Sequence, residues 1–402
     1  MNLYCDITLP ASKSESNRAL MIAAYGGFEP DFENLSDSKD TCILKEVLHG
    51  LSSVDSSAPT CQRWNDLGGS PCVINIADCG TAARFLTTYL ACHDGNWFLT
   101  GSERMKQRPM SPLIEALRAL GADIQYVEKE GFLPLQIHGK PLEGGKVSID
   151  MTQSSQFASS LLLAAPMWPQ GLEMEMLGDL SSLPYFEMTL VMMQHFSARV
   201  KRVGRTFVVE PISYQSRPFT IEPDWSAASY WYEMAAFSEA CEIRLHGLNA
   251  PSIGSVTASL QGDAVIAEWM QQLGVGTFVD GRDVVLKKIP IEKRPLSFGF
   301  SQHPDLYPTI AAICTGLNVE ANFTGLDNLA LKESDRVEAM QTELAKLGSC
   351  PIRFSAHNDH RIVMALAPLS MLVGPVFIDH PEVVKKSYPG FWKDASFLVV
   401  KR

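Results

Sequence analysis

Hydrophobic side chains recur at helical spacing in four segments of the chain, with polar side chains on the opposite face. Each segment ends in a Gly or a small residue and is followed by the alternating apolar and polar residues of a β-strand. The last apolar residues of these helices, Leu120, Phe196, Leu273 and Leu347, are separated by 76, 77 and 74 residues. A shorter helical segment ends at Leu51. This spacing predicts repeated units of an amphipathic helix followed by a strand.

A second kind of helix, small and apolar on every face, is predicted between the amphipathic helices. Its six copies begin at the following residues: Arg18, Thr81, Gln156, Ser226, Leu306 and Arg361. A helix without a polar face must be buried on all sides. Buried helices that alternate with amphipathic ones, with strands between them, predict an α/β chain of six similar units of about 65 to 75 residues.

The chain has 402 residues, a length that predicts two or three domains. Two clusters of three units would agree with this length, because a single hydrophobic core rarely grows so large. The alternative is one doubly wound sheet with insertions. The strong periodicity of the segments favours the six-unit arrangement.

The composition is that of a globular protein with a large core, since 46% of the residues are hydrophobic and 20% are charged. A net charge of −11 argues against a nucleic-acid or anionic membrane surface, because both need a basic face. An anionic ligand would therefore need positive charge that is gathered locally. Nine cysteines without a CxxC pair indicate neither a disulfide framework nor a zinc site, and favour free thiols in a reducing compartment.

The sequence contains no segment typical of export or membrane insertion. The first residues lack the basic and apolar regions of a secretory signal, so we expect a cytoplasmic protein. Residues 362–378 carry no charge over seventeen positions, the lower limit of a membrane span. Pro368, Gly374 and Pro375 in that segment favour a buried helix, a turn and a strand instead.

The polar residues before the buried helices differ from one copy to the next, although the helices resemble each other. They are Lys13 to Arg18, Asp78 to Thr81, Ser154 to Gln156, Asp224 to Ser226, Asp305, and Asn358 to Arg361. Free N–H groups and the helix dipole make such N-termini attractive to anions. Each Ser, Thr or Asp is also an ordinary N-cap, which is the more frequent role of one such residue considered alone.

Basic residues near a helix start are harder to explain as caps, because the dipole opposes a cation at that end. Three residues are of this kind: Lys13, Arg18 and Arg361. Residues 332–336, Lys-Glu-Ser-Asp-Arg, place opposed charges in the first turn of an amphipathic helix, where a salt-bridged surface is an equally good interpretation. Two basic loops, 104–109 and 385–389, are by default solvated.

Short motifs for metal or nucleotide binding do not occur in the sequence. His357 and His360 are close to each other, but no third His, Cys or carboxylate cluster supports a metal site. The chain has no GxxxxGK[ST], GxGxxG or GxSxG motif. We therefore expect neither a metal nor a nucleotide cofactor.

Nine short motifs occur in the order and spacing of one enzyme family: LPASKSESNRAL, DCGTAARFL, LTGSERMKQRPM, SSQF, LPY, SLQGD, LKESDR, NDHR and KKSYP. From about Ile7 to Trp392 the chain resembles the 5-enolpyruvylshikimate-3-phosphate synthases. The resemblance implies a two-domain inverse α/β barrel, with three βαβαββ-type units per domain and the active site in the interdomain cleft. Residues 1–12 and 223–402 would form one domain, and residues 13–222 the other.

The resemblance also implies an enzymatic reaction. Members of the family transfer the enolpyruvyl group of phosphoenolpyruvate to the 5-hydroxyl of shikimate 3-phosphate and release phosphate, on the route to chorismate and the aromatic amino acids. The reaction is an addition and elimination through a tetrahedral ketal. For this chain we expect a monomeric cytoplasmic enzyme with these two small-molecule substrates, no cofactor, no metal, and no nucleic-acid or membrane partner.

Residues that match the family's binding positions are implied to hold the two substrates. For shikimate 3-phosphate they are Lys13, Ser14, Arg18, Ser154, Ser155, Gln156, Ser182, Tyr185, Asp305, Asn328 and Lys332. For phosphoenolpyruvate they are Lys13, Gly80, Arg108, Gln156, Arg336, Arg361 and Lys386. Arginine suits two phosphates and two carboxylates, because its planar fork binds such groups bidentately.

Four residues are implied for the chemistry: Asp305, Lys13, Glu333 and His360. Asp305 would accept the proton of the attacking hydroxyl, and Lys13 would stabilise the bridging oxygen of the phosphate. Glu333 and His360 are candidates for moving the proton at C3. The sequence leaves open which of Lys13, Glu333 and His360 handles that proton.

Four positions depart from the family's usual pattern. Ala11 stands in place of a Gly and Asp78 in place of an Asn. Phe85 stands where many members carry Pro, and Leu183 where many carry a basic residue. None of these changes removes a catalytic group.

Two other classes of protein agree less well with this sequence. Most related transferases that act on UDP-N-acetylglucosamine carry a Cys in the loop that matches residues 104–109, and this loop has none. A non-catalytic repeat protein would show similar exposed residues in every unit, whereas each helix start in this chain is different. The sequence therefore favours the shikimate enzymes.

Overall fold

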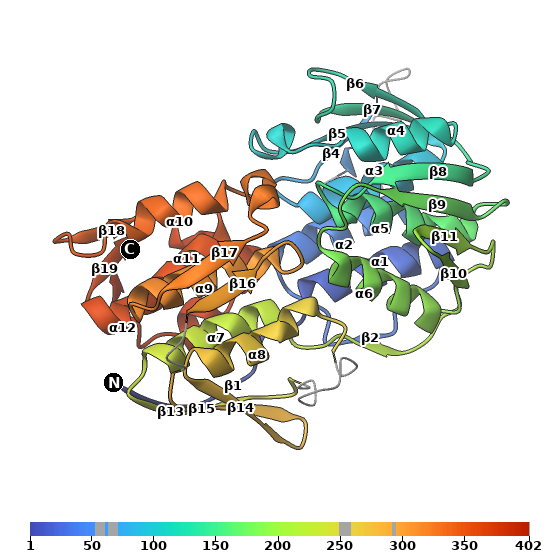
Figure 1. Ribbon diagram of the computed structural model, residues 1–402. Coiled ribbons are helices and arrows are strands. Elements are labelled where there is room, and N and C mark those ends of the chain that lie inside the picture. Colours follow the sequence, from blue (N-terminus) through green and yellow to red (C-terminus); the bar gives the residue numbers. More distant parts are fainter. Residues whose placement is uncertain (53–60, 63–70, 249–258, 292–294, 402) are drawn as a thin grey trace. The chain divides into compact units, whose positions relative to one another are not determined.

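A computed structural model describes residues 1–52, 61–62, 71–248, 259–291 and 295–401 (Figure 1). The chain forms two compact units. Unit 1 comprises Met1–Lys13, Ser36–Lys39 and Ile221–Arg402, and unit 2 comprises Ser14–Leu35 and Asp40–Thr220. Both termini therefore belong to unit 1.

Unit 2 contains two successive copies of a βαβαββ arrangement. The first consists of β4 (Cys72–Asn75), α3 (Gly80–Cys92), β5 (Gly95–Thr100), α4 (Ser111–Ala119), β6 (Asp123–Tyr126) and β7 (Leu135–Gly139). The second consists of β8 (Gly145–Asp150), α5 (Ser155–Ala164), β9 (Leu172–Leu177), α6 (Leu183–His195), β10 (Val200–Val203) and β11 (Thr206–Val209). Their strand orders are β4-β5-β7-β6, with the short β3 (Cys61–Gln62) beside β4, and β8-β9-β11-β10. In each sheet the first two strands are parallel and the last two form an antiparallel hairpin.

Unit 1 repeats this arrangement. One copy consists of β1 (Asn2–Ile7), α7 (Trp225–Phe237), β13 (Ala240–Leu245), α8 (Ile266–Gln272), β14 (Val275–Asp280) and β15 (Asp283–Lys288), with strand order β1-β13-β15-β14. A shorter copy has β16 (Leu296–Gly299), α9 (Tyr307–Gly316), β17 (Ala321–Thr324) and α10 (Arg336–Leu344). The last has β18 (Ile352–Phe354), α11 (His360–Leu366), α12 (Ser370–Val373), β19 (Val376–Ile378), α13 (Phe391–Asp394) and β20 (Val400–Lys401). The strands of both shorter copies pair in parallel.

The remaining copy, in unit 2, uses strands from distant parts of the chain. It contains α1 (Lys13–Gly26), β2 (Phe32–Glu33) and α2 (Lys39–Ser52), and β2 pairs in parallel with β12 (Phe219–Thr220). In the same way β1, at the start of the chain, pairs with β13 in unit 1. The described residues thus form three sheets in each unit, and the α/β class predicted from the sequence is confirmed.

Two of the segments that link the units are paired with each other. Ser12 N–H donates to the carbonyl of Glu222 at 2.8 Å, and Asp224 N–H donates to the carbonyl of Pro10 at 2.9 Å. The chain changes unit at residues 13/14, 35/36, 39/40 and 220/221. The sequence predicts only two crossings, at 12/13 and 222/223, and does not predict the short return around Ser36–Lys39. This pairing holds the linking segments to the unit that carries both termini.

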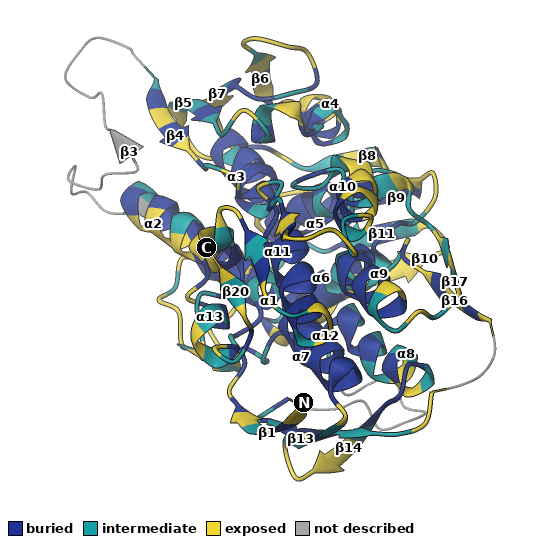
Figure 2. Ribbon diagram, turned by 90° about the vertical axis from the view of Figure 1, so that its left-hand side faces the viewer, coloured by how far each residue is buried: buried dark blue, intermediate teal, exposed yellow. Residues whose placement is uncertain are grey.

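The helices predicted to be apolar on every face are the most deeply buried ones. All residues of α7 and α11 are buried, as are all but one of α5, and these helices are dark blue in Figure 2. Within unit 1, α9 packs against α7 and α11; within unit 2, α5 packs against α3 and α6. The side chains of these helices therefore form much of the two cores.

Three helix boundaries differ from the sequence prediction. The first apolar helix begins at Lys13 instead of near Arg18, because residues 15–18 are themselves buried in the packed helix. Asp305 lies in a 3₁₀ turn, Pro304–Leu306, and does not cap the helix that follows. Near Pro368, which has no N–H to continue a helix, the last apolar helix changes to a 3₁₀ turn. Among the described helices, none is long and apolar enough to cross a membrane.

The four predicted helix stops share a left-handed backbone. The angle φ is +93° at Gly121, +76° at Ser197, +88° at Gly274 and +105° at Gly348. Glycine reaches this region without steric cost, which explains its place at three of the four stops. Ser197 shows that the repeat keeps the conformation even where the residue is less suited to it.

Replacing Gly274 by Ala should lower the free energy of unfolding by about 1 to 3 kcal/mol, through backbone strain and a clash. A Cβ at this position would lie 2.7 Å from Cγ1 of Ile291 and 3.2 Å from the carbonyl oxygen of Ile289. Gly121→Ala is the matched control, because its φ is also positive but its Cβ would meet nothing within 4 Å. Chemical denaturation of both variants measures the difference. Equal losses would show that packing at Gly274 contributes nothing.

Candidate active site

In unit 1, the predicted site residues converge on Arg336, the first residue of α10. Its Nε donates to Oδ2 of Asp359 at 2.8 Å, and its Nη1 donates to Oδ1 of Asp305 at 2.7 Å. Its Nη2 donates to Oε2 of Glu333 at 3.1 Å. The side chain is only 1% exposed, so these three carboxylates are needed to stabilise the buried charge. Burial by itself lowers the pKa of Arg336, but Asp359, Asp305 and Glu333 raise it above its ordinary value.

Arg361, the second residue of α11, binds the other oxygen of Asp305. Its Nη2 lies 2.6 Å from Oδ2 of Asp305 and donates to Oγ of Ser226 at 3.4 Å. Asp359 caps the same helix, because its Oδ1 accepts the N–H of Arg361 at 3.0 Å. The hydroxyl of Ser334 donates to Oδ2 of Asp359 at 3.1 Å. The starts of α10 and α11 are thereby joined through one buried carboxylate.

Asp305 is an ionised carboxylate in this arrangement. Burial would raise its pKa, but the charges of Arg361, Arg336 and Lys332 outweigh burial and hold the pKa well below its ordinary value. Both of its oxygens are engaged in short ion pairs. Asp305 is therefore a weak base in this state. It becomes a stronger base only when Arg336 and Arg361 bind another anion in its place.

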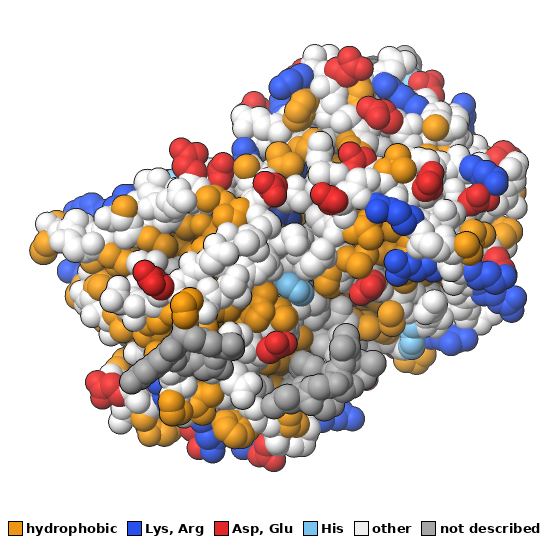
Figure 3. Space-filling view, in the orientation of Figure 1, with side chains coloured by type: hydrophobic (Ala, Val, Ile, Leu, Met, Phe, Trp, Pro, Cys, Tyr) orange, Lys and Arg blue, Asp and Glu red, His pale blue; other side chains and the backbone are white. Residues whose placement is uncertain are grey.

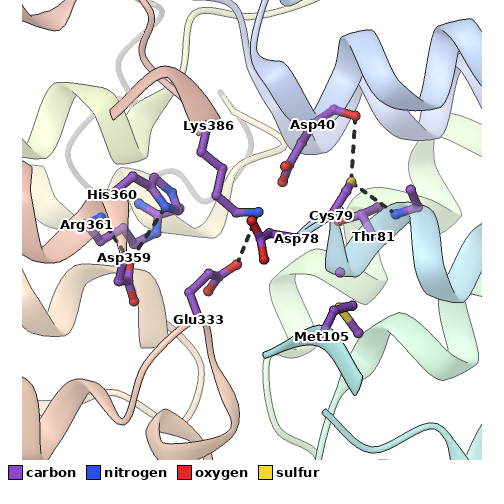
Figure 4. Close-up of polar contacts among 12 residues, drawn as sticks. Asp40, Asp78, Cys79, Thr81, Met105, Glu333, Asp359, His360, Arg361 and Lys386 are labelled. Atoms are coloured by element: carbon purple, nitrogen blue, oxygen red, sulfur yellow. Dashed lines mark hydrogen bonds and ion pairs between the residues drawn. The ribbon is translucent and has the colours of Figure 1, made fainter. Parts of the chain in front are cut away.

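Glu333 and Lys386 point toward each other beside this network (Figure 4). Lys386 is the last residue of a 3₁₀ helix, Pro381–Lys386, and its Nζ lies 4.0 Å from Oε1 of Glu333. Both side chains are largely buried, at 8% and 14% exposure. The predicted phosphoenolpyruvate ligand Lys386 is thus within reach of a predicted proton-transfer group.

His360, the first residue of α11, is buried beside the cap of its own helix. Its Nδ1 lies 3.5 Å from Oδ1 of Asp359 (Figure 4). Burial is the main cause that lowers the pKa of His360 well below its ordinary value, and Lys13 and Arg361 add to it. His360 is consequently a neutral imidazole at neutral pH.

The other predicted residues of unit 1 lie at the edges of these elements. Lys13 is the first residue of α1, Asn328 lies in the 3₁₀ helix Asp327–Leu331, and Lys332 follows that helix. Each is half-buried. The charge of Lys332 acts on Asp305 and that of Lys13 on His360, so both lysines are close enough to influence the buried groups.

Two buried carboxylates belong to the same network, although sequence reasoning assigned no site role to them. Asp359 contacts Arg336, as described above. Asp263 accepts the hydroxyl of Ser226, whose oxygen in turn accepts from Arg361. Burial, followed by the charge of Asp305, raises the pKa of Asp263 to about 6. The motifs NDHR and SLQGD contain these residues, but their pairing with arginine depends on contacts between distant segments.

In unit 2, the polar atoms of Arg18 are bound by uncharged protein groups. Its Nε donates to Oγ1 of Thr189 at 2.7 Å, and its Nη atoms donate to the carbonyls of Ser14 and Tyr185, both at 2.9 Å. The guanidinium lies 5.7 Å from the ring centre of Phe85. Burial lowers the pKa of Arg18 to about 10, so it remains charged at neutral pH. Arg18 joins α1 to the first turns of α6, where Tyr185 lies.

Gly80 and Arg108 are in close contact at the start of α3. A Cβ on Gly80 would lie 2.5 Å from Nη1 and 2.9 Å from Cζ of Arg108, so only glycine allows this approach. Arg108 follows the 3₁₀ helix Met105–Gln107 and is 8% exposed. The positive end of α3 and a guanidinium group repel each other, and an anion placed between them would stabilise both.

Side-chain hydrogen bonds hold the turn before α3. The Sγ of Cys79 accepts the N–H of Ala82 at 3.3 Å and lies 3.6 Å from the carbonyl oxygen of Asp40 (Figure 4). The hydroxyl of Ser102 donates to Asp78, the residue that replaces the family's usual Asn. The added negative charge at Asp78 is therefore bound within unit 2.

The start of α5 carries three predicted residues. Ser154 caps the helix by accepting the N–H of Gln156 at 3.2 Å, and Ser155 is buried in its first turn. The Nε2 of Gln156 donates to Oγ1 of Thr81 at 3.4 Å. This contact joins the start of α5 to the start of α3, so residues predicted for both substrates are linked there.

Ser182, at the start of α6, has an unusual backbone. Its φ of +53° and ψ of +38° are left-handed, and its hydroxyl does not cap the helix. This conformation costs a non-glycine residue about 1 to 2 kcal/mol and often marks a functional site. Leu183, the departure from the family's basic residue, is the first residue of α6 and lines a surface pocket with Phe186 and Arg202.

Together these residues supply anion-binding groups and acid–base groups. In unit 1, Arg336, Arg361 and Lys386 are compensated by carboxylates, so an anion must share or replace those partners. In unit 2, helix starts supply positive potential, and Arg108 lies at one of them, the start of α3. Acidic and basic side chains are interspersed over the face seen in Figure 3.

No group of three His, Cys, Asp or Glu side chains that could hold a metal ion occurs in the part of the chain that the structure describes. His357, considered with His360 from the sequence, instead places its Nε2 2.8 Å from Oε1 of the buried Glu343. That contact fixes the turn before α11.

Known proteins resemble this chain over nearly all of its length. The family model for EPSP synthase (3-phosphoshikimate 1-carboxyvinyltransferase) matches residues 1–395. The 3-phosphoshikimate 1-carboxyvinyltransferase of Bacteroides fragilis is 40% identical over 410 residues, which cover 96% of this chain and 93% of the relative. The enzyme of the same name from Syntrophobacter fumaroxidans is 34% identical over 420 residues, which cover 97% and 96%.

Solved structures show the same fold. The EPSP synthase of Acinetobacter baumannii superimposes with a TM-score of 0.70 at 20% identity, covering 99% of this chain and 96% of that one. The enolpyruvyl transferase NikO of Streptomyces tendae gives 0.65 at 16% identity, covering 98% and 95%. Because the family model spans almost the whole chain and the relatives named above exceed 30% identity, the chain belongs to the EPSP synthase (3-phosphoshikimate 1-carboxyvinyltransferase) family.

Proposed function

We propose that this chain transfers the enolpyruvyl group of phosphoenolpyruvate to the 5-hydroxyl of shikimate 3-phosphate and releases phosphate. It is a transferase of aromatic amino acid biosynthesis. The observation that carries the proposal is the family match over residues 1–395. We further propose that units 1 and 2 are the two three-repeat domains of a monomeric, cytoplasmic enzyme.

Shikimate 3-phosphate is assigned to helix starts of unit 2 and to polar groups of unit 1. Its phosphate would bind the hydroxyl and N–H groups at Ser154, Ser155 and Ser182, supported by the charge of Arg18. Arg18 suits this role because a hydroxyl and two carbonyls accept its hydrogen bonds, while the buried carboxylate of Glu15 acts on its charge and helps to keep it protonated. The remaining residues of this assignment are Lys13, Ser14, Gln156, Tyr185, Asp305, Asn328 and Lys332.

Phosphoenolpyruvate is assigned to cations from both units. Its carboxylate and phosphate would bind Arg108 beside Gly80 in unit 2, and Arg336 and Arg361 in unit 1. Lys13, Gln156 and Lys386 complete this assignment. The close contact of Arg108 with the start of α3 supports it, because an anion bound between the two would stabilise both.

The ion pairs of Asp305 suggest how substrate binding would prepare the base. In the free chain, Arg336 and Arg361 keep the pKa of Asp305 low. When phosphoenolpyruvate attracts both guanidinium groups, Asp305 loses its cationic partners and its pKa rises toward a value suited to proton transfer. Asp305 then accepts the proton of the 5-hydroxyl as the hydroxyl oxygen attacks C2.

The transfer of the proton to and from C3 is assigned to Glu333 and Lys13. C3 gains a proton as the ketal forms, and loses one when phosphate leaves, with Lys13 at the bridging oxygen. The lowered pKa of His360 argues against an imidazolium donor at neutral pH. His360 would act as a neutral group beside Asp359.

Phosphate release tests the function directly. Shikimate 3-phosphate and phosphoenolpyruvate together should yield phosphate and an enolpyruvyl product seen by mass spectrometry. UDP-N-acetylglucosamine with phosphoenolpyruvate is the control pair and should yield neither. No phosphate from the first pair at ample enzyme would overturn the proposal.

Asp305→Asn should lower kcat by about 10² to 10⁴-fold, the usual worth of a general base. Asp327→Asn is the matched control, because it makes the same chemical change at an exposed residue of unit 1. The control should retain kcat. Steady-state kinetics of both variants measure this difference. If the kcat of Asp305→Asn stayed within a few-fold of the wild type, Asp305 would not be the general base.

Gly80→Ala should raise KM for phosphoenolpyruvate by about tenfold or more. The added methyl group would displace the guanidinium group of Arg108, and the substrate would lose at least one charged hydrogen bond. KM for shikimate 3-phosphate should change little. Gly299→Ala is the control, since its Cβ would meet Thr324 at an ordinary 3.5 Å. An unchanged KM for phosphoenolpyruvate in Gly80→Ala would contradict the assignment of Arg108.

A further inference from the structure

A buried arginine without an assigned substrate role contacts the residues of unit 2 that are assigned to phosphoenolpyruvate. Arg84, in the second turn of α3, is 2% exposed. Its Nη1 donates to the carbonyl of Gly80 at 3.2 Å and lies 3.7 Å from Sδ of Met105. Its Nη2 donates to the carbonyl of Pro109 at 2.9 Å. The guanidinium lies 5.7 Å from the ring centre of Phe157, on α5.

These contacts bracket Arg108. Met105 and Pro109 are at the two ends of the segment that carries Arg108, and Gly80 is the residue on which its guanidinium rests. Arg84 therefore ties both ends of this segment to the start of α3. Its own carbonyl accepts the hydroxyl of Ser160 of α5 at 2.7 Å, which fixes α3 against the helix that begins with Ser155.

The chemistry of these contacts requires arginine. The two Nη atoms reach acceptors on two separate segments, and the planar group packs over an aromatic ring. A lysine at this position would have one ammonium group and could not span both carbonyls in the same geometry. The guanidinium group of Arg84 also holds a positive charge inside unit 2, close to the start of α3 where an anion would bind.

We propose that Arg84 is a positioning residue for phosphoenolpyruvate, which places Arg108 over the start of α3 without touching the substrate. This inference rests on the proposed function and extends it to a residue that neither substrate contacts. Loss of Arg84 would leave Arg108 present but misplaced. The defect should then fall on phosphoenolpyruvate and spare shikimate 3-phosphate.

The test is Arg84→Lys, measured by steady-state kinetics with each substrate varied. KM for phosphoenolpyruvate should rise about 10- to 100-fold, the worth of one to two charged hydrogen bonds, and KM for shikimate 3-phosphate should stay within about 3-fold. The matched control is Arg118→Lys. Arg118 donates through Nε and Nη2 to the carbonyl of Ile124 at 2.9 and 2.7 Å and lies 4.9 Å from the ring centre of Tyr126. It makes similar contacts on a segment without an assigned substrate role, so its KM values should not change.

A second variant separates positioning from stability. Arg84→Ala should regain a low KM for phosphoenolpyruvate when guanidinium ion is added at millimolar concentration, whereas ethylammonium should not restore it. Melting temperatures of all variants report on folding. Equal rises in both KM values, a loss of kcat alone, or KM values unchanged from the wild type would each overturn the inference.

Failure of the proposed function would be seen separately, as a wild type that releases no phosphate. In that case, the role of Arg84 is tested by calorimetric titration with phosphoenolpyruvate. Arg84→Lys should bind phosphoenolpyruvate more weakly than both Arg118→Lys and the wild type. Equal binding in all three proteins would overturn the inference.

Discussion

A helix that is apolar on every face can expose only its ends, and this constraint decides where the chemistry of this protein can lie. In α7 and α11 every residue is buried, and α5 is almost as enclosed. Polar residues are tolerated where these helices begin, because free N–H groups there need partners. Ser154, Asp224 and Asp359 each supply such a partner. Six similar units thus present six helix starts, and each start can differ without disturbing the core.

Two buried arginines of the site, Arg18 in α1 and Arg336 at the start of α10, are stabilised in two different ways, with different consequences for anion binding. Arg336 has three carboxylate partners, so its charge is cancelled until a ligand competes for it. Arg18 donates its hydrogen bonds to a hydroxyl and two carbonyls, and the carboxylate of Glu15 acts on its charge as well. The pKa directions agree, since that of Arg336 is raised and that of Arg18 is lowered to about 10. The hydrogen bonds of Arg18 therefore go to uncharged groups, whereas Arg336 must exchange carboxylate partners before it binds another anion.

The features that sequence reasoning predicted are those with a local cause. Periodicity predicted the buried helices, and a Gly or small residue predicted where each amphipathic helix stops. The structure adds that the backbone at these stops is left-handed, even at Ser197. The family resemblance pointed to Arg336 and Asp305, which are in contact. What could not be predicted depends on contacts between distant residues. The Asp263–Ser226–Arg361 chain of hydrogen bonds joins three separate segments. The pairing of β1 with β13, and of β2 with β12, likewise has no signal in the residues of the strands themselves.

Phe85, which stands where many family members carry Pro, shows how a residue inside a core can influence the binding site. A proline at this sixth position of α3 would remove a helical N–H, whereas phenylalanine keeps it. The ring of Phe85 lies against the guanidinium of Arg18, which binds the carbonyl of Tyr185 on α6. The neighbouring Arg84 binds the carbonyl of Gly80 in the same helix. Two consecutive residues of α3 therefore couple the group assigned to shikimate 3-phosphate with the groups assigned to phosphoenolpyruvate. Movement of this helix would change the binding of both substrates together.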